Sequence, residues 1–361
     1  GMMLPGGACT PAVMSERMRH AEASGARAVA LAKEKLTPDR IMTPDAFENA
    51  LRVLLAIGGS TNAIIHLTAM AGRLGIAVDL EGFDRMGRDT PVLVDLKPTG
   101  RHYMEDLEKA GGLAPILREL QPLLKLDALT VTGRTLRDNI ASAPAPWKQE
   151  VVRPIGNPVF REGGIALLRG NLAPGGAIIK QSAMDPKLMR HEGRAVVFES
   201  LEDLAACVDD PALDVGADDI LVLKSAGPKG APGMPEAGYI PIPKKLAQKG
   251  VKDMIRISDA RMSGTAFGAI VLHVTPESAI GGPLGWVRNG DRIRLDVPAR
   301  KLELLVSEAE MESRRRAWRG PAPRDEDSRG YRKLFLDAVT QADRGCDFDF
   351  LAPPATIRIP R

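Results

Sequence analysis

The spacing of apolar residues divides the chain into a helix-like first part and a strand-like second part. Up to about residue 142, apolar positions recur every three or four residues, as on one face of an α-helix. Beyond that point, short aliphatic runs alternate with glycine- and proline-rich turns, which is typical of buried β-strands. We therefore predict a mainly helical domain over residues 1–150. A β-rich domain with a helical tail is predicted over residues 151–361.

The first part contains clear signals for where helices begin and end. Residues 14–35 are rich in alanine and charged residues, which favours a helix. Thr43 followed by Pro44 is a typical helix start, because threonine caps free amides and proline fits the first turn. Gly58 and Gly59 end that helix, and Ser60 is predicted to cap the next. This second helix, which starts at Ser60, is expected to continue to Gly75. The other elements expected in this part are a buried strand over residues 91–95 and a helix over residues 104–120 that is broken at Gly111 and Gly112.

The second part contains a series of aliphatic runs that predict strands. These runs cover residues 164–168, 176–180, 194–198, 220–224, 254–257, 270–274 and 301–306. Asn289-Gly290 predicts a tight turn, because both residues tolerate positive φ angles. Short helices are expected over residues 201–207 and 243–249.

Composition and charge narrow the class of protein. The 361 residues are 44% hydrophobic and 26% charged, with a net charge of +3, which is ordinary for a soluble globular protein. No block of lysine and arginine is interleaved with aromatics, so we expect no nucleic-acid partner. The basic cluster Arg314–Arg319 is interpreted as the solvated end of a helix.

Targeting signals and cysteine spacing suggest a compartment. No apolar run is long enough for a membrane span and no signal-peptide pattern opens the chain, so we expect no membrane association. Cys9, Cys207 and Cys346 lie far apart and form no metal-binding spacing. Free thiols without a secretory signal suggest a cytoplasmic protein.

Candidate chemistry is concentrated in two loops that follow strand-like runs. Residues Gly227–Glu236 are dense in glycine and proline and hold one carboxylate, Glu236, which is an oxygen ligand suited to Mg²⁺. From composition alone, a structural crossover loop with a solvated glutamate is the more frequent alternative. Residues Ser258–Gly268 place Ser263 and Thr265 between two strands. No GxSxG elbow surrounds Ser263, so a structural turn serine remains the alternative from spacing alone.

Two further features are weaker signals. Residues 59–62 stand at a helix start and could receive an anion on free amides, although such caps are usually structural. His66 lies one turn inside the same helix among apolar neighbours, and we interpret it as a core histidine. None of these patterns alone names a reaction.

Six segments spread along the chain form distinctive sequence motifs. They are Met3–Gly6, Gly58–Leu67, Gly163–Leu172, Gly227–Glu236, Ser258–Gly268 and Gly345–Leu351. In this order they resemble the dihydroxy-acid and sugar-acid dehydratases, iron–sulfur enzymes that remove water from 2,3-dihydroxy acids. The resemblance covers essentially the whole chain. The motif Ser-Asp-Ala-Arg-Met-Ser-Gly-Thr resembles that of the sugar-acid branch of the family. The fold it implies is α/β: the latter, mainly helical part of an α/β N-terminal domain, followed by a swivelling β/β/α barrel-like domain.

The resemblance also implies a mechanism and roles for three residues. In this family a cluster iron polarises the departing C3 hydroxyl, Mg²⁺ holds the substrate carboxylate and C2 hydroxyl, and a serine removes the C2 proton. The product is a 2-keto-3-deoxy acid. By motif position, the resemblance assigns the base to Ser263, the Mg²⁺ carboxylate to Glu236 and a substrate-contacting hydroxyl to Thr265.

The chain departs from the family pattern in ways that affect these roles. The resemblance places the cluster cysteines and the other Mg²⁺ ligands, including a modified lysine, upstream of Met3–Gly6, so we expect no iron–sulfur ligand in this chain. Cys9 is accordingly not assigned to the cluster. Phe267 stands where many relatives have tyrosine, and Ala338 where the C-terminal helix often has histidine. If the upstream sheet is missing, residues 51–74 are expected to expose an apolar face.

Three interpretations follow from the resemblance. The first is the C-terminal portion of a sugar-acid dehydratase, inactive alone, which is a fragment or one half of a split enzyme with an N-terminal partner. The second is a catalytically inactive relative that serves as a binding or regulatory module for sugar acids. The third, ranked last, is a metal-independent enzyme that uses Ser263 alone. The family also suggests a homo-oligomer.

Overall fold

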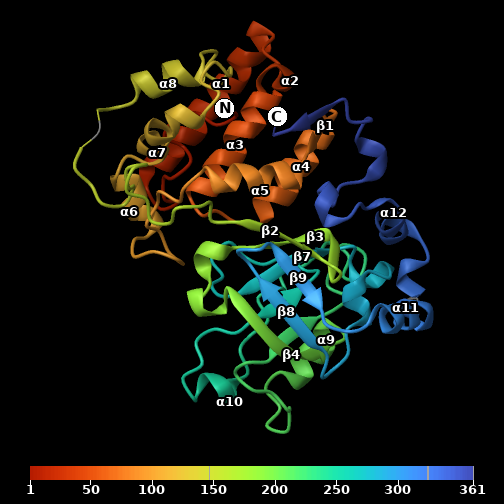
Figure 1. Cartoon of the computed structure of the whole chain (residues 1–361). Coiled ribbons are helices and arrows are strands. Elements are labelled where there is room, and N and C mark those ends of the chain that lie inside the picture. The colour runs from red at the N-terminus through yellow and green to blue at the C-terminus, as the bar shows by residue number, and fades with distance from the viewer. Residues whose placement is uncertain (146, 323–324, 361) are drawn as a thin grey trace. The chain divides into compact units, whose positions relative to one another are not determined.

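The computed structural model describes residues 1–145, 147–322 and 325–360, which form two compact units (Figure 1). The first unit contains Gly1–Gly59, Leu74–Gly164 and the residues from Ala355 on. The second contains Ser60–Arg73 and Ile165–Pro354. The units therefore interleave along the chain, and the division near residue 150 stays a prediction.

The first unit is mainly helical, as the apolar spacing predicted. Its helices are α1 (Ser15–Glu34), α2 (Pro38–Ile41), α3 (Pro44–Ala56), α5 (Leu80–Arg88), α6 (Met104–Lys109), α7 (Leu113–Leu120) and α8 (Leu136–Ser142). A small parallel sheet joins β1 (Ile76–Val78) to β10 (Ile357–Ile359). The break between α6 and α7 lies at Gly111 and Gly112, whose φ angles of 101° and 62° favour glycine.

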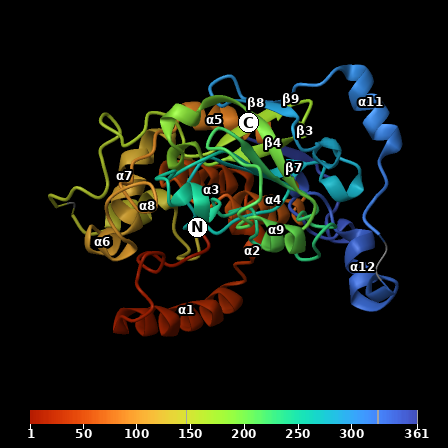
Figure 2. The ribbon, with the colours of Figure 1, turned by 90° about the horizontal axis from the view of Figure 1, so that it is seen from below.

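Helix α3 forms the centre of the first unit. Thr43 Oγ1 accepts a hydrogen bond from the amide of Ala46, which confirms the predicted helix start. Leu51 and Leu55 are fully buried, and α3 contacts α5, α7 and β10. The apolar face expected to be exposed over residues 51–74 is therefore wrong for α3, because other parts of the same unit cover it. Helix α1 has no buried residue and lies at the edge of its unit in Figure 2.

The strand predicted over residues 91–95 is wrong, although the segment is buried. Val92 and Val94 form only isolated bridges, to Phe160 and Val152. Between them, the amide of Leu93 donates to the carbonyl of Ala56 at the end of α3, so no continuous ladder can form.

The second unit is built on a closed eight-stranded barrel. Its strands are β2 (Ala166–Gly170), β3 (Ala173–Ile179), β4 (Arg190–Phe198), β5 (Ile220–Leu223), β6 (Arg256–Ser258), β7 (Ile270–Thr275), β8 (Arg292–Asp296) and β9 (Lys301–Leu304), in the order β2-β3-β7-β6-β5-β4-β8-β9. Each predicted aliphatic run overlaps one of them. The mixed α/β class and the barrel-like sheet are confirmed, whereas the finer description as a swivelling β/β/α domain stays a prediction.

Both faces of the central strands are buried, which explains their continuous aliphatic sequence. On β5, Ile220 and Val222 belong to one apolar cluster, and Leu221 and Leu223 belong to another. Alternate side chains of a strand point to opposite faces, so each strand serves two cores. The second cluster includes Leu204 of α9 (Leu201–Cys207).

The remaining helices of the second unit are α4 (Asn62–Gly72), α10 (Lys244–Ala247), α11 (Glu308–Ala317) and α12 (Gly330–Ala338). Both ribbon views show α11 and α12 at the outer edge of this unit (Figures 1 and 2). No helix in residues 1–145, 147–322 or 325–360 is long and apolar enough to cross a membrane.

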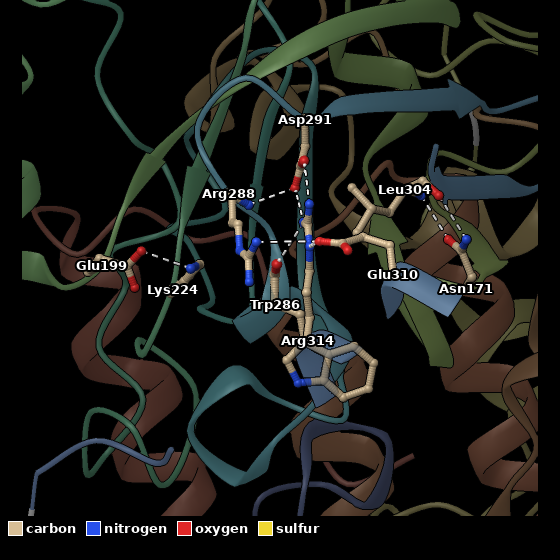
Figure 3. Close-up of polar contacts among 9 residues, drawn as sticks. All are labelled: Asn171, Glu199, Lys224, Trp286, Arg288, Asp291, Leu304, Glu310 and Arg314. Atoms are coloured by element: carbon tan, nitrogen blue, oxygen red, sulfur yellow. Dashed lines mark hydrogen bonds and ion pairs between the residues drawn. The ribbon is translucent and has the colours of Figure 1, made fainter. Parts of the chain in front are cut away.

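Arg314 ties α11 to the turn that precedes β8. Its Nη2 lies 3.0 Å from Asp291 Oδ1, its Nε lies 2.6 Å from Glu310 Oε1, and its Nη1 donates to the carbonyl of Trp286 at 3.1 Å (Figure 3). The side chain is buried. The interpretation of the cluster Arg314–Arg319 as solvated is therefore wrong for Arg314, because a paired arginine is stable in a buried site.

A buried ion pair holds both ends of the Ser258–Gly268 segment, which we call the serine loop. Arg256 and Asp253 are 2.8 Å apart, and their side chains are 1% and 4% exposed. Asp253 also accepts from the amide of Ala269, and Arg256 donates to the carbonyl of Phe267. Burial lowers the pKa of Arg256, and Asp253 opposes that shift.

We expect Asp253→Ala to lower the free energy of unfolding by about 3–5 kcal/mol, because it leaves a buried guanidinium without its carboxylate. The matched control is Glu192→Ala, which removes a carboxylate shared by Arg292 and Arg294 on the surface and should cost less than about 1 kcal/mol. Urea unfolding followed by circular dichroism measures both changes. Equal losses in the two variants would contradict a structural role for the buried pair.

Candidate active site

The two candidate loops leave the same end of the barrel. They follow β5 and β6, which are adjacent and parallel, so their carboxyl ends lie side by side. The amide of Gly238 donates to the carbonyl of Arg261 at 2.8 Å, and Arg261 Nε donates to the carbonyl of Met234 at 2.6 Å. These bonds join the Gly227–Glu236 loop and its continuation to the serine loop.

Ser263 and Thr265 lie together at the tip of the serine loop. Their hydroxyl oxygens are 3.1 Å apart, and the amide of Ala266 donates to the carbonyl of Ser263. Ser263 is half-buried and Thr265 is exposed, so ligand can reach both. Among the described residues, Ser263 Oγ has no histidine or carboxylate within hydrogen-bonding distance. A hydrolase-type triad is therefore not formed by this part of the chain.

Glu236 lies against the start of α4. Its Oε1 accepts a hydrogen bond of 2.5 Å from Nδ2 of Asn62, which is 174 residues away in the sequence. Sequence reasoning gave residues 59–62 only a weak capping role and missed this contact. Local spacing cannot reveal so distant a partner. The signal that could have found it was that this segment is one of the six that resemble the family.

The start of α4 also approaches the serine loop. A Cβ atom on Gly264 would lie 2.8 Å from Ser60 Cβ, which is closer than side chains allow, so glycine is required there. Ser60 Oγ accepts from the amide of Asn62 at 3.2 Å. Three segments that are distant in sequence therefore converge: the start of α4, the Glu236 loop and the serine loop.

Two expectations about α4 are wrong. The helix begins at Asn62 with Thr61 as its N-cap residue and ends at Gly72, with Arg73 as its C-cap residue, and so does not reach Gly75. His66 is exposed and is not a core histidine. It lines a cavity of about 260 Å³, and the buried face of α4 is formed instead by residues such as Ile65.

Two buried carboxylates fix the beginning of the Glu236 loop. Asp259 accepts from the amide of Ala226 at 3.0 Å and from the amide of Ser278 at 2.8 Å. Glu277 accepts from the amides of Lys229 and Gly230 at 2.9–3.0 Å. Burial raises the pKa of both carboxyl groups, and these hydrogen bonds oppose the shift. The loop that carries Glu236 is thus anchored through its backbone.

The oxygen atoms around Glu236 fit a magnesium ligand set in part. Glu236 is exposed and forms no ion pair among the described residues, and Asn62 Oδ1 is buried without a hydrogen-bond partner. A carboxylate beside an amide oxygen suits Mg²⁺, which usually completes its shell with water and substrate oxygens. Glu236 would be the charged ligand that this chain contributes.

The cysteines do not fit an iron–sulfur cluster. Burial raises the pKa of Cys9 to about 11 and that of Cys346 to about 12, which disfavours the thiolate that binds metal. Cys207 donates to Asp203, which raises its pKa. No group of three His, Cys, Asp or Glu side chains in the described residues could hold a metal ion.

The two departures from the family pattern lie in different environments. Phe267 is 43% exposed in the serine loop, and its carbonyl accepts a hydrogen bond from Arg256 of the buried ion pair. Ala338 is buried at the end of α12. Whether either position contacts substrate stays a prediction.

Comparison with known proteins accounts for this convergence of segments. The family model described as dihydroxy-acid/6-phosphogluconate dehydratase C-terminal matches residues 150–346, and the corresponding N-terminal model matches residues 1–139. The chain is 50% identical to an L-arabonate dehydratase of Azospirillum brasilense, covering 100% of this chain and 63% of that protein. It is 49% identical to an L-arabinonate dehydratase of Rhizobium leguminosarum, covering 97% of this chain and 60% of the relative.

A 6-deoxy-6-sulfo-D-gluconate dehydratase of Pseudomonas putida is 46% identical over 97% of this chain and 61% of its own length. The chain thus spans about 60% of the length of the curated relatives it matches. Matches to both family models, with the serine loop and the Glu236 loop inside the C-terminal one, show that the chain belongs to the dihydroxy-acid and 6-phosphogluconate dehydratase family.

Proposed function

We propose that this chain provides the serine and magnesium side of the active site of a hydro-lyase that converts a 2,3-dihydroxy sugar acid into a 2-keto-3-deoxy acid. The supporting observation is the convergence of Ser263, Thr265 and Glu236 at one end of the barrel in a member of this family. The names of the most similar relatives point to aldonic acids as the substrate class.

Each residue has a role that its environment supports. Glu236 would hold Mg²⁺, which would supply a positive charge that polarises the carboxylate and C2 hydroxyl of the substrate and so makes the C2 proton more acidic. Ser263 Oγ takes that proton. The hydroxyl of Thr265, 3.1 Å away, can donate to the serine oxygen and stabilise its negative charge. Loss of the C2 proton and the C3 hydroxyl yields water and an enol, which tautomerises to the keto acid.

The family also implies an iron–sulfur cluster, and none of the described cysteines fits one. No step is therefore assigned to the cluster, and its ligands are proposed to lie outside these residues, in another segment or an N-terminal partner chain. The inactive sugar-acid-binding relative remains the alternative. It predicts saturable binding of an aldonate with no keto acid, even when a cluster-bearing partner is supplied.

Calorimetric titration of the chain with L-arabonate, with and without Mg²⁺, tests the proposed ligand chemistry. We expect Mg²⁺ to strengthen aldonate binding by about tenfold or more, because an ion held by Glu236 would attract the carboxylate and C2 hydroxyl oxygens of the acid. The 2-deoxy analogue lacks that hydroxyl and should gain less. Equal binding of both acids, with no effect of Mg²⁺, would contradict the proposal.

A further inference from the structure

Lys180 is a buried lysine at the end of β3, and among the described residues it has no ion-pair partner. Its side chain is 2% exposed, and its Nζ makes one hydrogen bond, of 3.5 Å, to the carbonyl of Gly264. An ammonium group has three donors, and a charged group this buried is normally paired. Burying this charge without an ion-pair partner costs folding free energy, which points to a functional reason for the position.

The hydrogen-bond partner of Lys180 among the described residues belongs to the serine loop. Gly264 lies between Ser263 and Thr265, and its carbonyl is part of the peptide that leads into Thr265. The segment that follows Lys180 makes a second contact with the loop, because the amide of Gly268 donates to the carbonyl of Ala183. Lys180 and the 3₁₀ turn that follows it, Gln181–Ala183, therefore contact the serine loop at two points.

The charged groups of the neighbouring segments are engaged elsewhere. Asp253 pairs with Arg256, Asp259 accepts from Ala226 and Ser278, Arg261 donates to the carbonyl of Met234, and Arg300 donates to Gln181 and Val297. On β7, which pairs with β3, His273 is buried and burial lowers its pKa to about 3, so it is neutral. Burial alone lowers the pKa of Lys180, to about 8.

We propose that Lys180 is a positioning residue for the base: its ammonium fixes the Gly264 carbonyl and places a positive charge beside the anionic form of Ser263. This inference rests on the proposed function of Ser263. A serine base needs a nearby positive charge because its ordinary pKa is far above neutrality. Lys180 provides one from within this chain, in addition to the charge that a metal ion at Glu236 would supply.

Lys180→Met tests the inference, because methionine has a similar length and no charge. The matched control is Lys187→Met, seven residues further along on an exposed 3₁₀ turn. We expect Lys180→Met to melt at or above the wild-type temperature, since it removes a buried unpaired charge. Reconstituted with Mg²⁺ and a cluster-binding partner, it should lose 10–100-fold in kcat with KM changed less than threefold. Lys187→Met should match the wild type in both.

The pH profile separates a charge role from simple packing. Lys180 is protonated below its pKa of about 8, so wild-type kcat should fall as the pH rises above 8. This loss should be absent in Lys180→Met. The stability difference has the opposite direction: because the folded pKa is below 10.5, the cost of burying the charge is complete below pH 8 and disappears as the pH rises to 10.5. The wild type should therefore gain stability relative to Lys180→Met across that window.

Hydrogen exchange gives a readout that does not depend on activity. The amides of Ala266 and Gly268 are hydrogen-bonded in the serine loop, and we expect both to exchange faster in Lys180→Met than in Lys187→Met. Faster exchange in Lys180→Met, together with a wild type that never turns over, would preserve the positioning role and reject the proposed function. An active wild type whose kcat and pH profile are unchanged in Lys180→Met would overturn the inference about Lys180.

Discussion

Replacing Ser263 with alanine is expected to lower kcat for aldonate dehydration by about 10²–10⁴-fold, the range for loss of a general base. The substitution removes Oγ and leaves the serine loop in place, because the loop is held through Gly264, Gly268 and Ala269 and not through this hydroxyl. KM should change little, since Glu236 is untouched. Rates of keto-acid formation are measured anaerobically with Mg²⁺ and a cluster-binding partner.

Two further variants serve as comparisons for the Ser263→Ala result. Ser142→Ala changes an exposed serine at the end of α8 and should leave kcat unaltered. Thr265→Val removes the hydroxyl 3.1 Å from Ser263 Oγ and should have a smaller effect than Ser263→Ala, because it supports the base and does not accept the proton. A Ser263→Ala protein that keeps more than a tenth of wild-type kcat would show that another group is the base.

Glu236→Gln is expected to weaken Mg²⁺ binding by more than about 10–100-fold, the loss seen when a group supporting a metal ligand is removed. Glutamine keeps the size and one oxygen of the side chain but removes the negative charge that attracts the ion. Isothermal titration with Mg²⁺ in the presence of L-arabonate measures the effect without catalysis. Glu308→Gln, at the exposed start of α11, is the control for charge. Equal Mg²⁺ affinity in the two variants would reject Glu236 as a ligand.

The elements that could be predicted are those whose signals are local. Helix α9 spans Leu201–Cys207 as expected, because Ser200 caps it by accepting from the amide of Asp203. The strands of the barrel could be located because burial on both faces produces unbroken aliphatic runs. By contrast, β1 and β10 have three residues each and pair across most of the chain. Three residues are too few for their sequence to be distinguished from that of an ordinary loop.

The candidate site shows the same limit. Ser263, Thr265 and Glu236 could be named because their motifs resemble a family, yet spacing alone did not distinguish them from structural residues. Asn62 became part of the site only through a contact across 174 residues. Lys180 follows an aliphatic run, where a lysine usually marks a strand end that reaches solvent. Closure of the barrel buries it, and barrel closure is a property of the whole unit.

The account is tested most directly by a search for 2-keto acid after anaerobic reconstitution with iron, sulfide, Mg²⁺ and a cluster-binding partner chain. The panel should include L-arabonate, other aldonic acids and a 3-deoxy aldonate, which has no C3 hydroxyl to lose. We predict keto acid from at least one 2,3-dihydroxy acid, none from the 3-deoxy acid, and none without the partner. No keto acid from any member, with cluster and Mg²⁺ fully bound, would contradict the proposed dehydratase site.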